Sequence, residues 1–173
     1  ERFEDKRDVK GIYHLHGATL HDEILLVPMI LFAPGRVQPG VVGSQVRTVD
    51  LMPTLLELVG GYPDDIDGTS LMPVVNGSEQ ADRVALAATT DRGVISQLAL
   101  RSPPWKLIHH LETEGEVAYR IDVDPDEATN RFDETPSELR AQLNLEVASI
   151  ERQELSAEEE AVVTGRLADL GYL

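Results

Sequence analysis

The chain has 173 residues, of which 42% are hydrophobic, and it contains no cysteine. This length and composition predict a folded globular chain with one domain, or one domain and a small appendage, rather than a disordered one. The formal net charge of −16 would repel nucleic acid and anionic membrane, so neither is an expected partner, and the lack of cysteine excludes disulfides, thiolate metal sites and cysteine nucleophiles from this chain. The acidic excess fits an ordinary acidic protein or adaptation to high salt, and it indicates no compartment.

The first 35 residues lead from a charged stretch into the longest apolar run of the chain. Residues 1–12 are predicted to form a surface loop, and the missing initiator Met suggests the back part of a longer protein. The apolar run, residues 24–33, is shorter than the about 20 residues that cross a bilayer. With Pro34 and Gly35 after it, the run predicts a strand buried on both faces of a parallel sheet. Titratable groups at the mouth of such a strand are typical of α/β active sites.

Residues 50–59 are predicted to form a helix. Asp50 is a candidate N-cap, Pro53 falls in the first turn, and the Gly60-Gly61 pair ends the helix. An apolar stripe runs along it at helical spacing, and its members are Leu51, Met52, Leu55, Leu58 and Val59. A short helical turn is expected at residues 69–76.

Four short strands joined by tight connections predict a small antiparallel sheet. They are residues 84–89, 94–101, 105–111 and 117–123, with a hairpin turn at 90–93. Pro136 then opens a helix whose apolar residues repeat at helical spacing: Leu139, Leu143, Val147 and Ile150. Ser156 begins a capping signature that predicts a last short helix.

Histidines near the start of the apolar run are the first candidates for chemistry. His14 and His16 are two residues apart, which on a loop or strand places both on one side and suits a metal or an anion. His21 follows beside Asp22, and Gly17 would let the backbone approach a ligand closely. Such a cluster could bind an anion or move a proton near neutral pH. Surface histidines often have no function, so these residues alone leave both interpretations open.

Three other features favour structural roles. His109 and His110 alternate along a predicted strand, so one is expected in the core and one at the surface. Trp105 is predicted to pack in the core. A set of acidic residues lacks the glycine and the spacing of a calcium loop and predicts a solvated turn; its members are Asp122, Asp124, Asp126 and Glu127.

Several motifs of the chain, in order, resemble those of the arylsulfatase-like sulfatase family. They are residues 16–30 (His-Gly-Ala-Thr-Leu-His-Asp-Glu onward), 49–60, 66–73, 105–108 with 118–130, and 170–173. Each motif is modest by itself, but the ordered set is specific and covers almost the whole chain.

The resemblance implies an α/β fold like that of alkaline phosphatase. In that fold a large sheet is sandwiched by helices and is followed by a small four-stranded antiparallel sheet with C-terminal helices. Residues 1–80 would form the C-terminal part of the α/β core. Residues 81–173 would form the small antiparallel-sheet subdomain.

The resemblance also implies sulfuric ester hydrolase activity for the protein that includes this chain, on a sulfate-ester small molecule or glycan. The family's formylglycine nucleophile and divalent cation, usually calcium, would come from sequence ahead of this chain, and Glu1 would end the motif that carries a metal-binding pair. His16 matches the position where many arylsulfatases place a lysine that contacts the sulfate, so it is implied to be catalytic, with His14 as its second-choice neighbour. His21 replaces the usual tyrosine and is implied to be structural.

Two alternatives remain open at this stage. One is a phosphate mono- or diester hydrolase, or a phosphotransferase, of the same superfamily. The other is a non-catalytic binding or assembly module. A strand like residues 24–33 expects neighbours on both edges, so the chain alone is predicted to be inactive and either poorly soluble or a homo-oligomer.

Overall fold

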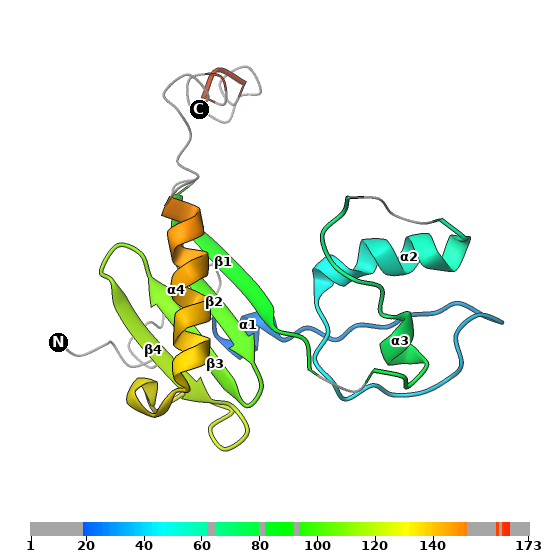
Figure 1. Ribbon diagram of the computed structural model, residues 1–173, viewed down its shortest axis with the longest axis horizontal. Helices are drawn as coiled ribbons and strands as arrows, with labels where there is room; N and C mark the ends of the chain where they lie inside the picture. Colours follow the sequence, from blue (N-terminus) through cyan, green and yellow to red (C-terminus); the bar gives the residue numbers. More distant parts are fainter. Residues whose placement is uncertain are drawn as a thin grey trace.

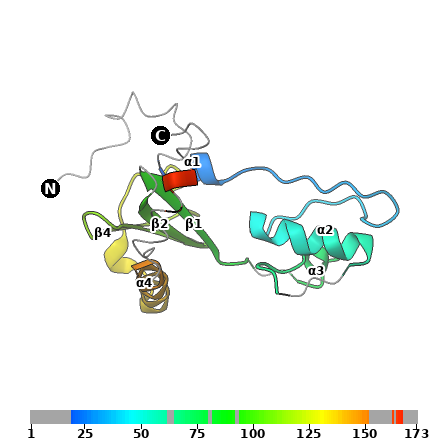
Figure 2. The same cartoon turned by 90° about the horizontal axis from the view of Figure 1, so that it is seen from above.

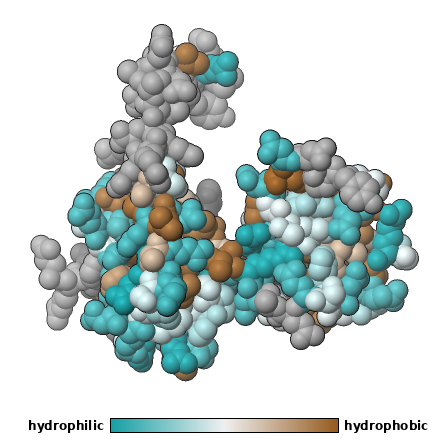
Figure 3. All heavy atoms as spheres, viewed as in Figure 1, coloured by the Kyte–Doolittle hydropathy of each residue, from teal (hydrophilic) through white to brown (hydrophobic). Residues whose placement is uncertain are grey.

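The protein folds into two lobes with a narrow connection, seen in the ribbon of Figure 1 and in the space-filling view of Figure 3. The structure is a computed structural model that describes residues 19–61, 65–79, 82–91, 94–151, 162 and 164–166. We call residues 19–25 and 84–151 the sheet lobe, and residues 26–83 the helical lobe. Within the described ranges, no helix is long and apolar enough to cross a membrane.

The sheet lobe contains the predicted four-stranded antiparallel sheet. Its strands lie in sequence order and are β1 (Ala85–Asp91), β2 (Val94–Ser102), β3 (Trp105–His110) and β4 (Gly115–Arg120). All three pairings are antiparallel. The fourth strand begins and ends earlier than predicted, because the chain already turns at residues 121–123.

Both faces of this sheet are covered. Helix α4 (Ser137–Glu151) packs on one face, as its apolar spacing predicted, and the short helix α1 (Asp22–Leu25) lies on the other (Figure 2). The cluster under α4 contains Leu98, Leu100, Leu107, Ala118, Leu143 and Val147, with Trp105 packed against it as expected. The cluster under α1 contains Leu20, Ala99, Ile108, Val117 and Tyr119.

The predicted buried strand at residues 24–33 is wrong. Residues 24 and 25 belong to α1, and residues 26–33 form no strand. None of residues 26–33 is buried, and Ile30 is 90% and Phe32 85% exposed. A strand buried on both faces needs neighbours that pair its N–H and C=O groups. Among the described residues, all four strands belong to the small sheet and none lies beside this run.

The helical lobe contains a short helical turn η2 (Thr48–Asp50), followed by α2 (Leu51–Val59) and α3 (Met72–Val75). The predicted helix and its glycine stop are confirmed, because Gly60 adopts a left-handed φ of 83° that closes α2. The apolar stripe of α2 lies partly open to solvent, since Met52 is 59% exposed. Helix α3 confirms the helical turn expected at residues 69–76.

Asp50 precedes α2 but does not cap it through its side chain. Its carboxylate is instead directed to arginines, as described below. Gly68 lies against the same turn with a φ of 89°, and a Cβ there would be 2.4 Å from the carbonyl oxygen of Val49. Only glycine fits that position.

The predicted division of the chain into residues 1–80 and 81–173 stays a prediction. Leu20 and Asp22, which fall in the first predicted domain, contact the small sheet of the second. The last predicted helix, from Ser156, lies largely outside the described residues. Within it the structure describes residues 162 and 164–166, which are helical.

Candidate functional site

The two histidines singled out from the sequence, His14 and His16, lie outside the described residues. Description begins at Thr19, three residues after His16. The structure therefore shows how the chain that continues from these histidines is held.

This continuation is inserted between the sheet and a loop. Leu20 is buried in the apolar cluster on the α1 face of the sheet. The ring of His21 lies beside that of Tyr119, with centroids 5.6 Å apart. Its Nδ1 is 3.2 Å from Oε2 of Glu127, in the loop after β4. His21 thus has two structural neighbours, in keeping with the structural role that the family resemblance implied.

Asp22 is held at both its backbone and its side chain. Its carboxylate accepts hydrogen bonds from the guanidinium of Arg101, the shortest at 2.7 Å, and from Nζ of Lys106 at 2.9 Å. Its backbone N–H donates to Oε2 of Glu127 at 2.7 Å. Four stretches of the chain, residues 20–22, 101, 106 and 127, therefore meet at one point.

Lys106 is the centre of this arrangement. The side chain is fully buried, and its Nζ is 2.7 Å from Oε1 of Glu127 as well as 2.9 Å from Asp22. A buried ammonium without partners would lose its proton, but here two carboxylates flank it. We call Asp22, Arg101, Lys106 and Glu127 the anchor cluster. Two cations and two anions balance within it.

Electrostatics keep both carboxylates of the anchor cluster ionised. Burial alone would raise the pKa of Asp22, but hydrogen bonds from Arg101 and Lys106 outweigh it and hold the pKa below its ordinary value. The pKa of Glu127 is lowered in the same way, against burial, by His21 and Lys106. Burial, reinforced by the negative charges of Glu127 and Asp124, raises the pKa of Tyr119 to about 12, so its phenol stays protonated.

Glu127 corrects the prediction of a solvated acidic turn. Asp122 and Asp126 are exposed as expected, but Glu127 is 3% exposed. Its backbone has a left-handed φ of 50°, which is uncommon for a residue other than glycine, asparagine or aspartate. Asp124 contributes to this turn by accepting the N–H groups of residues 128 and 129 at 3.1 and 2.9 Å. Its carboxylate thus shapes the loop that turns Glu127 inward.

The prediction that one of His109 and His110 is in the core and one at the surface is wrong. Both are half-buried, because both faces of the sheet are packed. His109 lies 3.3 Å from Glu116 across the strand pair. Burial lowers the pKa of His110, and positive charge on His109 and His21 adds to that effect.

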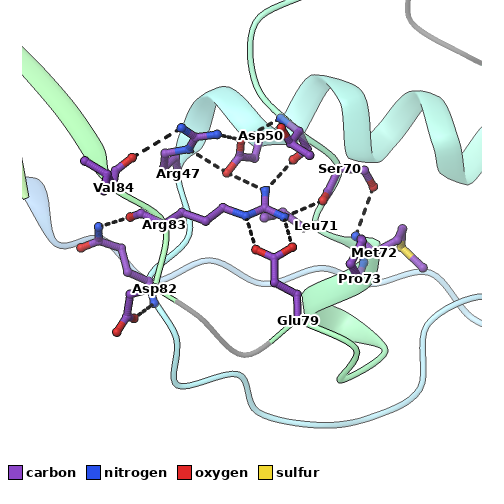
Figure 4. Close-up of polar contacts among 12 residues, drawn as sticks. Arg47, Asp50, Ser70, Leu71, Met72, Pro73, Glu79, Asp82, Arg83 and Val84 are labelled. Carbon is purple, nitrogen blue, oxygen red and sulfur yellow. Dashed lines mark hydrogen bonds and ion pairs between the residues drawn. The ribbon is translucent and has the colours of Figure 1, made fainter. Parts of the chain in front are cut away.

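A second buried carboxylate organises the helical lobe (Figure 4). Asp50 is fully buried and lies 2.7 Å from Arg47 and 3.0 Å from Arg83. It also accepts the N–H of Thr69 at 2.9 Å. Burial alone would raise its pKa, but the hydrogen bonds from Arg47, Thr69 and Arg83 lower it overall. The guanidinium of Arg83 also donates to the carboxylate of Glu79 and to backbone carbonyls. The ion pairs around Asp50 are therefore structural.

Gln45 connects the two charged arrangements. Its side-chain amide donates to the backbone oxygens of Arg83 and Arg101, the latter at 3.0 Å, and its side-chain oxygen accepts from the guanidinium of Arg101. Its backbone N–H donates to Asp82 at 2.6 Å. The narrow connection between the lobes is therefore polar and adjoins the anchor cluster.

The described part of the chain does not fit the divalent cation that the resemblance implies. It contains no group of three or more histidine or acidic side chains that could hold a metal ion. The two carboxylates of the anchor cluster, Asp22 and Glu127, already form ion pairs with Arg101 and Lys106.

The sequence interpretation missed the anchor cluster, although signals for it were present. Lys106 shares its strand face with the buried Ile108, where a charged side chain needs a partner. Asp22, Lys106 and Glu127 each occur in one of the motifs that carry the family resemblance. What the sequence did not show is that these motifs meet.

Comparison with known proteins identifies what the chain is similar to. The family described as "N-sulphoglucosamine sulphohydrolase, C-terminal" matches residues 15–153. Choline-sulfatase of Rhizobium meliloti (strain 1021) is 30% identical over 108 residues, which cover 60% of this chain and 21% of that protein. Arylsulfatase A of Bos taurus is 35% identical over 105 residues, covering 57% and 20%. The chain thus spans about a fifth of these relatives.

Solved structures agree on the fold. One, described as a sulfatase from Bacteroides thetaiotaomicron VPI-5482, is 27% identical with a TM-score of 0.50 and covers 62% of this chain and 26% of that one. Another, connected with glycosaminoglycan metabolism in Bacteroides thetaiotaomicron, has a TM-score of 0.51 at 19% identity and covers 69% and 28%. The predicted fold class, alkaline-phosphatase-like with a small antiparallel sheet, is confirmed.

Proposed function

Because this chain belongs to the N-sulphoglucosamine sulphohydrolase C-terminal family, we propose that it is the C-terminal part of a sulfatase that hydrolyses sulfate esters. The observation that carries the proposal is the continuous match over residues 15–153. That range includes His16, the anchor cluster and the whole small sheet. The chain is then one portion of a longer enzyme, which we call the parent protein.

His16 is the residue of this chain to which we assign a part in the reaction. A protonated imidazole can offset charge on the sulfuryl oxygens or on the leaving oxygen as the ester bond breaks. His14, two residues earlier, is the second choice. Support comes from the match of His16 to the lysine position of related arylsulfatases and from the anchoring of residues 20–22 just after it.

The remaining machinery belongs to the rest of the parent protein. Formylglycine supplies the nucleophile in this family, and a divalent cation, most often calcium, binds acidic residues that the described part of this chain does not provide. The role of this chain is to present a histidine and to hold the segment that bears it.

The substrate is a sulfate-ester small molecule or glycan. The names of the relatives include both classes, choline-sulfatase for one and a hexuronate-2-O-sulfatase of Bacteroides thetaiotaomicron for the other. The proposal therefore commits to the sulfate group and not to the alcohol attached to it.

Rates on paired esters test the proposal. We expect the purified parent protein to hydrolyse 4-nitrophenyl sulfate with a higher kcat/KM than 4-nitrophenyl phosphate. Faster hydrolysis of the phosphate would replace the proposal with a phosphoester hydrolase of the same superfamily. Hydrolysis of neither ester, with the protein folded, would favour a binding module.

Substitution of His16 tests its assigned role. In the parent protein, we expect His16→Gln to lower kcat/KM for the sulfate by about 10²- to 10⁴-fold, the usual effect of removing a general acid, and to flatten the alkaline limb of the pH profile. His109→Gln, which changes a histidine in the small sheet, is the matched control and should leave both unchanged. Equal rates for the His16 variant and the control would remove His16 from the reaction.

A further inference from the structure

We propose that Lys106 is a positioning residue. Together with Glu127 it fastens residues 20–22 to the small sheet, and so it fixes the end of the segment that carries His14 and His16. The catalytic consequence rests on the proposed function, whereas the fastening is independent of it. Lys106 touches no reacting atom in this proposal and acts through Asp22 and Glu127.

The contacts single out Lys106 among the residues of the anchor cluster. Asp22 and Glu127 are 105 positions apart in the sequence, and Lys106 is the side chain whose single ammonium group contacts both, at 2.9 and 2.7 Å. The guanidinium of Arg101 pairs with Asp22 at 2.7 Å. Removing Lys106 thus takes away the cation shared by the segment and the loop after β4, so that the direct contacts of Glu127 with His21 and with the N–H of Asp22 are left to hold the two together.

The segment has little structure of its own to keep it in place. Helix α1 has four residues, far fewer than the about 12 to 15 that make an isolated helix even marginally stable. Its N-cap, His21, makes no side-chain capping bond. Its position must therefore come from contacts with the rest of the lobe: Leu20 in the apolar cluster, His21 against Tyr119 and Glu127, and the bonds of Asp22.

The backbone of Glu127 directs its carboxylate toward the anchored segment. A left-handed conformation is unfavourable for a residue with a Cβ. Glu127 adopts it, with a φ of 50°, and aims its carboxylate at Lys106, His21 and the N–H of Asp22. Glu114 has a similar φ of 52° in the exposed turn before β4, so what indicates a built contact is the direction of the Glu127 carboxylate and not its backbone conformation alone.

The chain transmits this position to His16. His16 lies four positions before Leu20, so their Cα atoms can be at most about 14 Å apart. A shift of the anchored segment moves the point from which His16 reaches the substrate. Misplacement of a reacting group by about 1 Å can lower a rate about 10²-fold.

Lys106→Met tests the fastening. The variant keeps the approximate length of the side chain but removes the ammonium group that contacts both Asp22 and Glu127. Arg120→Met is the matched control, because Arg120 pairs with Asp122 in exposed positions of the same sheet. Hydrogen exchange of the parent protein is followed by mass spectrometry in peptides covering residues 19–26 and 96–100.

We expect Lys106→Met to speed exchange in residues 19–26 at least tenfold while residues 96–100 stay as protected as in the control. Adding Glu127→Gln to Lys106→Met removes the uncompensated carboxylate and should restore part of the protection. Unchanged protection of residues 19–26 would overturn the proposal. Equal loss in both peptides would also overturn it, because Lys106 would then stabilise the sheet as a whole.

Kinetics of the same variants test the consequence for catalysis. On 4-nitrophenyl sulfate we expect Lys106→Met to lower kcat about 10- to 100-fold, to change KM by less than threefold, and to be partly rescued by Glu127→Gln. An unchanged kcat in a variant whose segment exchanges faster would overturn the positioning role. A wild-type parent protein without sulfate-ester activity would overturn the proposed function instead, and the exchange result would still decide whether Lys106 fastens the segment.

Discussion

The two lobes each enclose a carboxylate held by two cations, but they differ in what surrounds it. In the sheet lobe, Asp22 lies beside an apolar cluster, and a second apolar cluster fills the opposite face of the sheet. In the helical lobe, Asp50 is fully buried, and the buried apolar side chains among the described residues are Pro53, Leu71 and Val74. The sheet lobe therefore has a core, whereas the helical lobe is organised around ion pairs.

This difference indicates which of the two lobes resists unfolding more. Burial of apolar area is the dominant favourable contribution to folding, while desolvation offsets much of the gain from a buried ion pair. The helical lobe also exposes large apolar side chains such as Ile30 and Phe32. We infer that the sheet lobe resists unfolding more than the helical lobe, and that the helical lobe has surface suited to cover by other protein.

The largest expected effect comes from cutting into the core of the sheet lobe. Leu100 is fully buried between β2 and α4, and Leu100→Ala should lower the free energy of unfolding of this lobe by about 3 kcal/mol through lost burial and a cavity. Urea unfolding followed by hydrogen exchange of residues 96–110 measures it. Exchange in α2 should not change.

A matched control is Leu86→Ala on β1, because Leu86 is about half exposed. Its effect should stay below about 1 kcal/mol. Similar losses for Leu100→Ala and Leu86→Ala would contradict the assignment of a core to this face of the sheet.

A second, smaller effect is expected in the helical lobe. Gly68→Ala would place a Cβ 2.4 Å from the backbone oxygen of Val49, in a backbone conformation with φ of 89°. We expect a loss of about 2 kcal/mol, from strain added to the roughly 1 kcal/mol cost of a left-handed alanine. Hydrogen exchange of the α2 amides measures it, and β2 should remain protected.

Gly77→Ala separates the clash from the backbone cost. Gly77 also has a left-handed φ, of 76°, but no atom lies within 4 Å of a Cβ there. It should therefore cost only about 1 kcal/mol. If the two alanine variants behaved alike, the close approach of residue 68 to the turn before α2 would not matter for stability.

The sheet lobe was predictable from sequence because its signals are local. Alternating strands, a turn at residues 90–93 and apolar residues at helical spacing from Leu139 to Ile150 each specify an element within a few residues. The helix ending at Gly60 was predictable for the same reason. The run at 24–33 was predicted wrongly, because composition shows that a segment is apolar but not which strands are present to pair with it.

The candidate site was only partly predictable. His14 and His16 were selected from their spacing and from the family resemblance, and their roles stay predictions. The anchor cluster depends on contacts between Asp22 and residues 79 and 84 positions away, and no local pattern reports such distant pairs. Glu127 was assigned to a solvated turn because its neighbours are acidic, although its own backbone turns it inward.

The smallest expected effect uses pH to separate the lobes. Burial depresses the pKa of His110 below its ordinary value of 6.5, so the unfolded chain binds more protons than the folded one as the pH falls past 6.5. Stability from this residue is therefore complete above pH 6.5 and is lost as the pH falls toward the folded pKa. The helical lobe, residues 26–83, contains no histidine.

The carboxylates of both lobes titrate in a lower range. The pKa values of Asp22, Asp50 and Glu127 are depressed from ordinary values of 3.8 to 4.5. The stability that they contribute is complete above those values and is lost only as the pH falls below them. Between about pH 5 and 6.5, the titration of these carboxylates therefore does not change stability. A pH dependence in that interval is expected from histidine, and of the two lobes only the sheet lobe contains histidines.

Within that interval we expect the sheet lobe alone to lose stability, and we expect His110→Gln to reduce the slope of its stability against pH. Hydrogen exchange at pH 5.0, 5.75 and 6.5, corrected for the intrinsic effect of pH on exchange, measures both lobes in one sample, with α2 as the internal control. An equal slope of stability against pH in α2 would mean that the two lobes unfold together. It would contradict the inference that the two lobes differ in stability. A slope that persists in His110→Gln would contradict the assignment of the effect to His110.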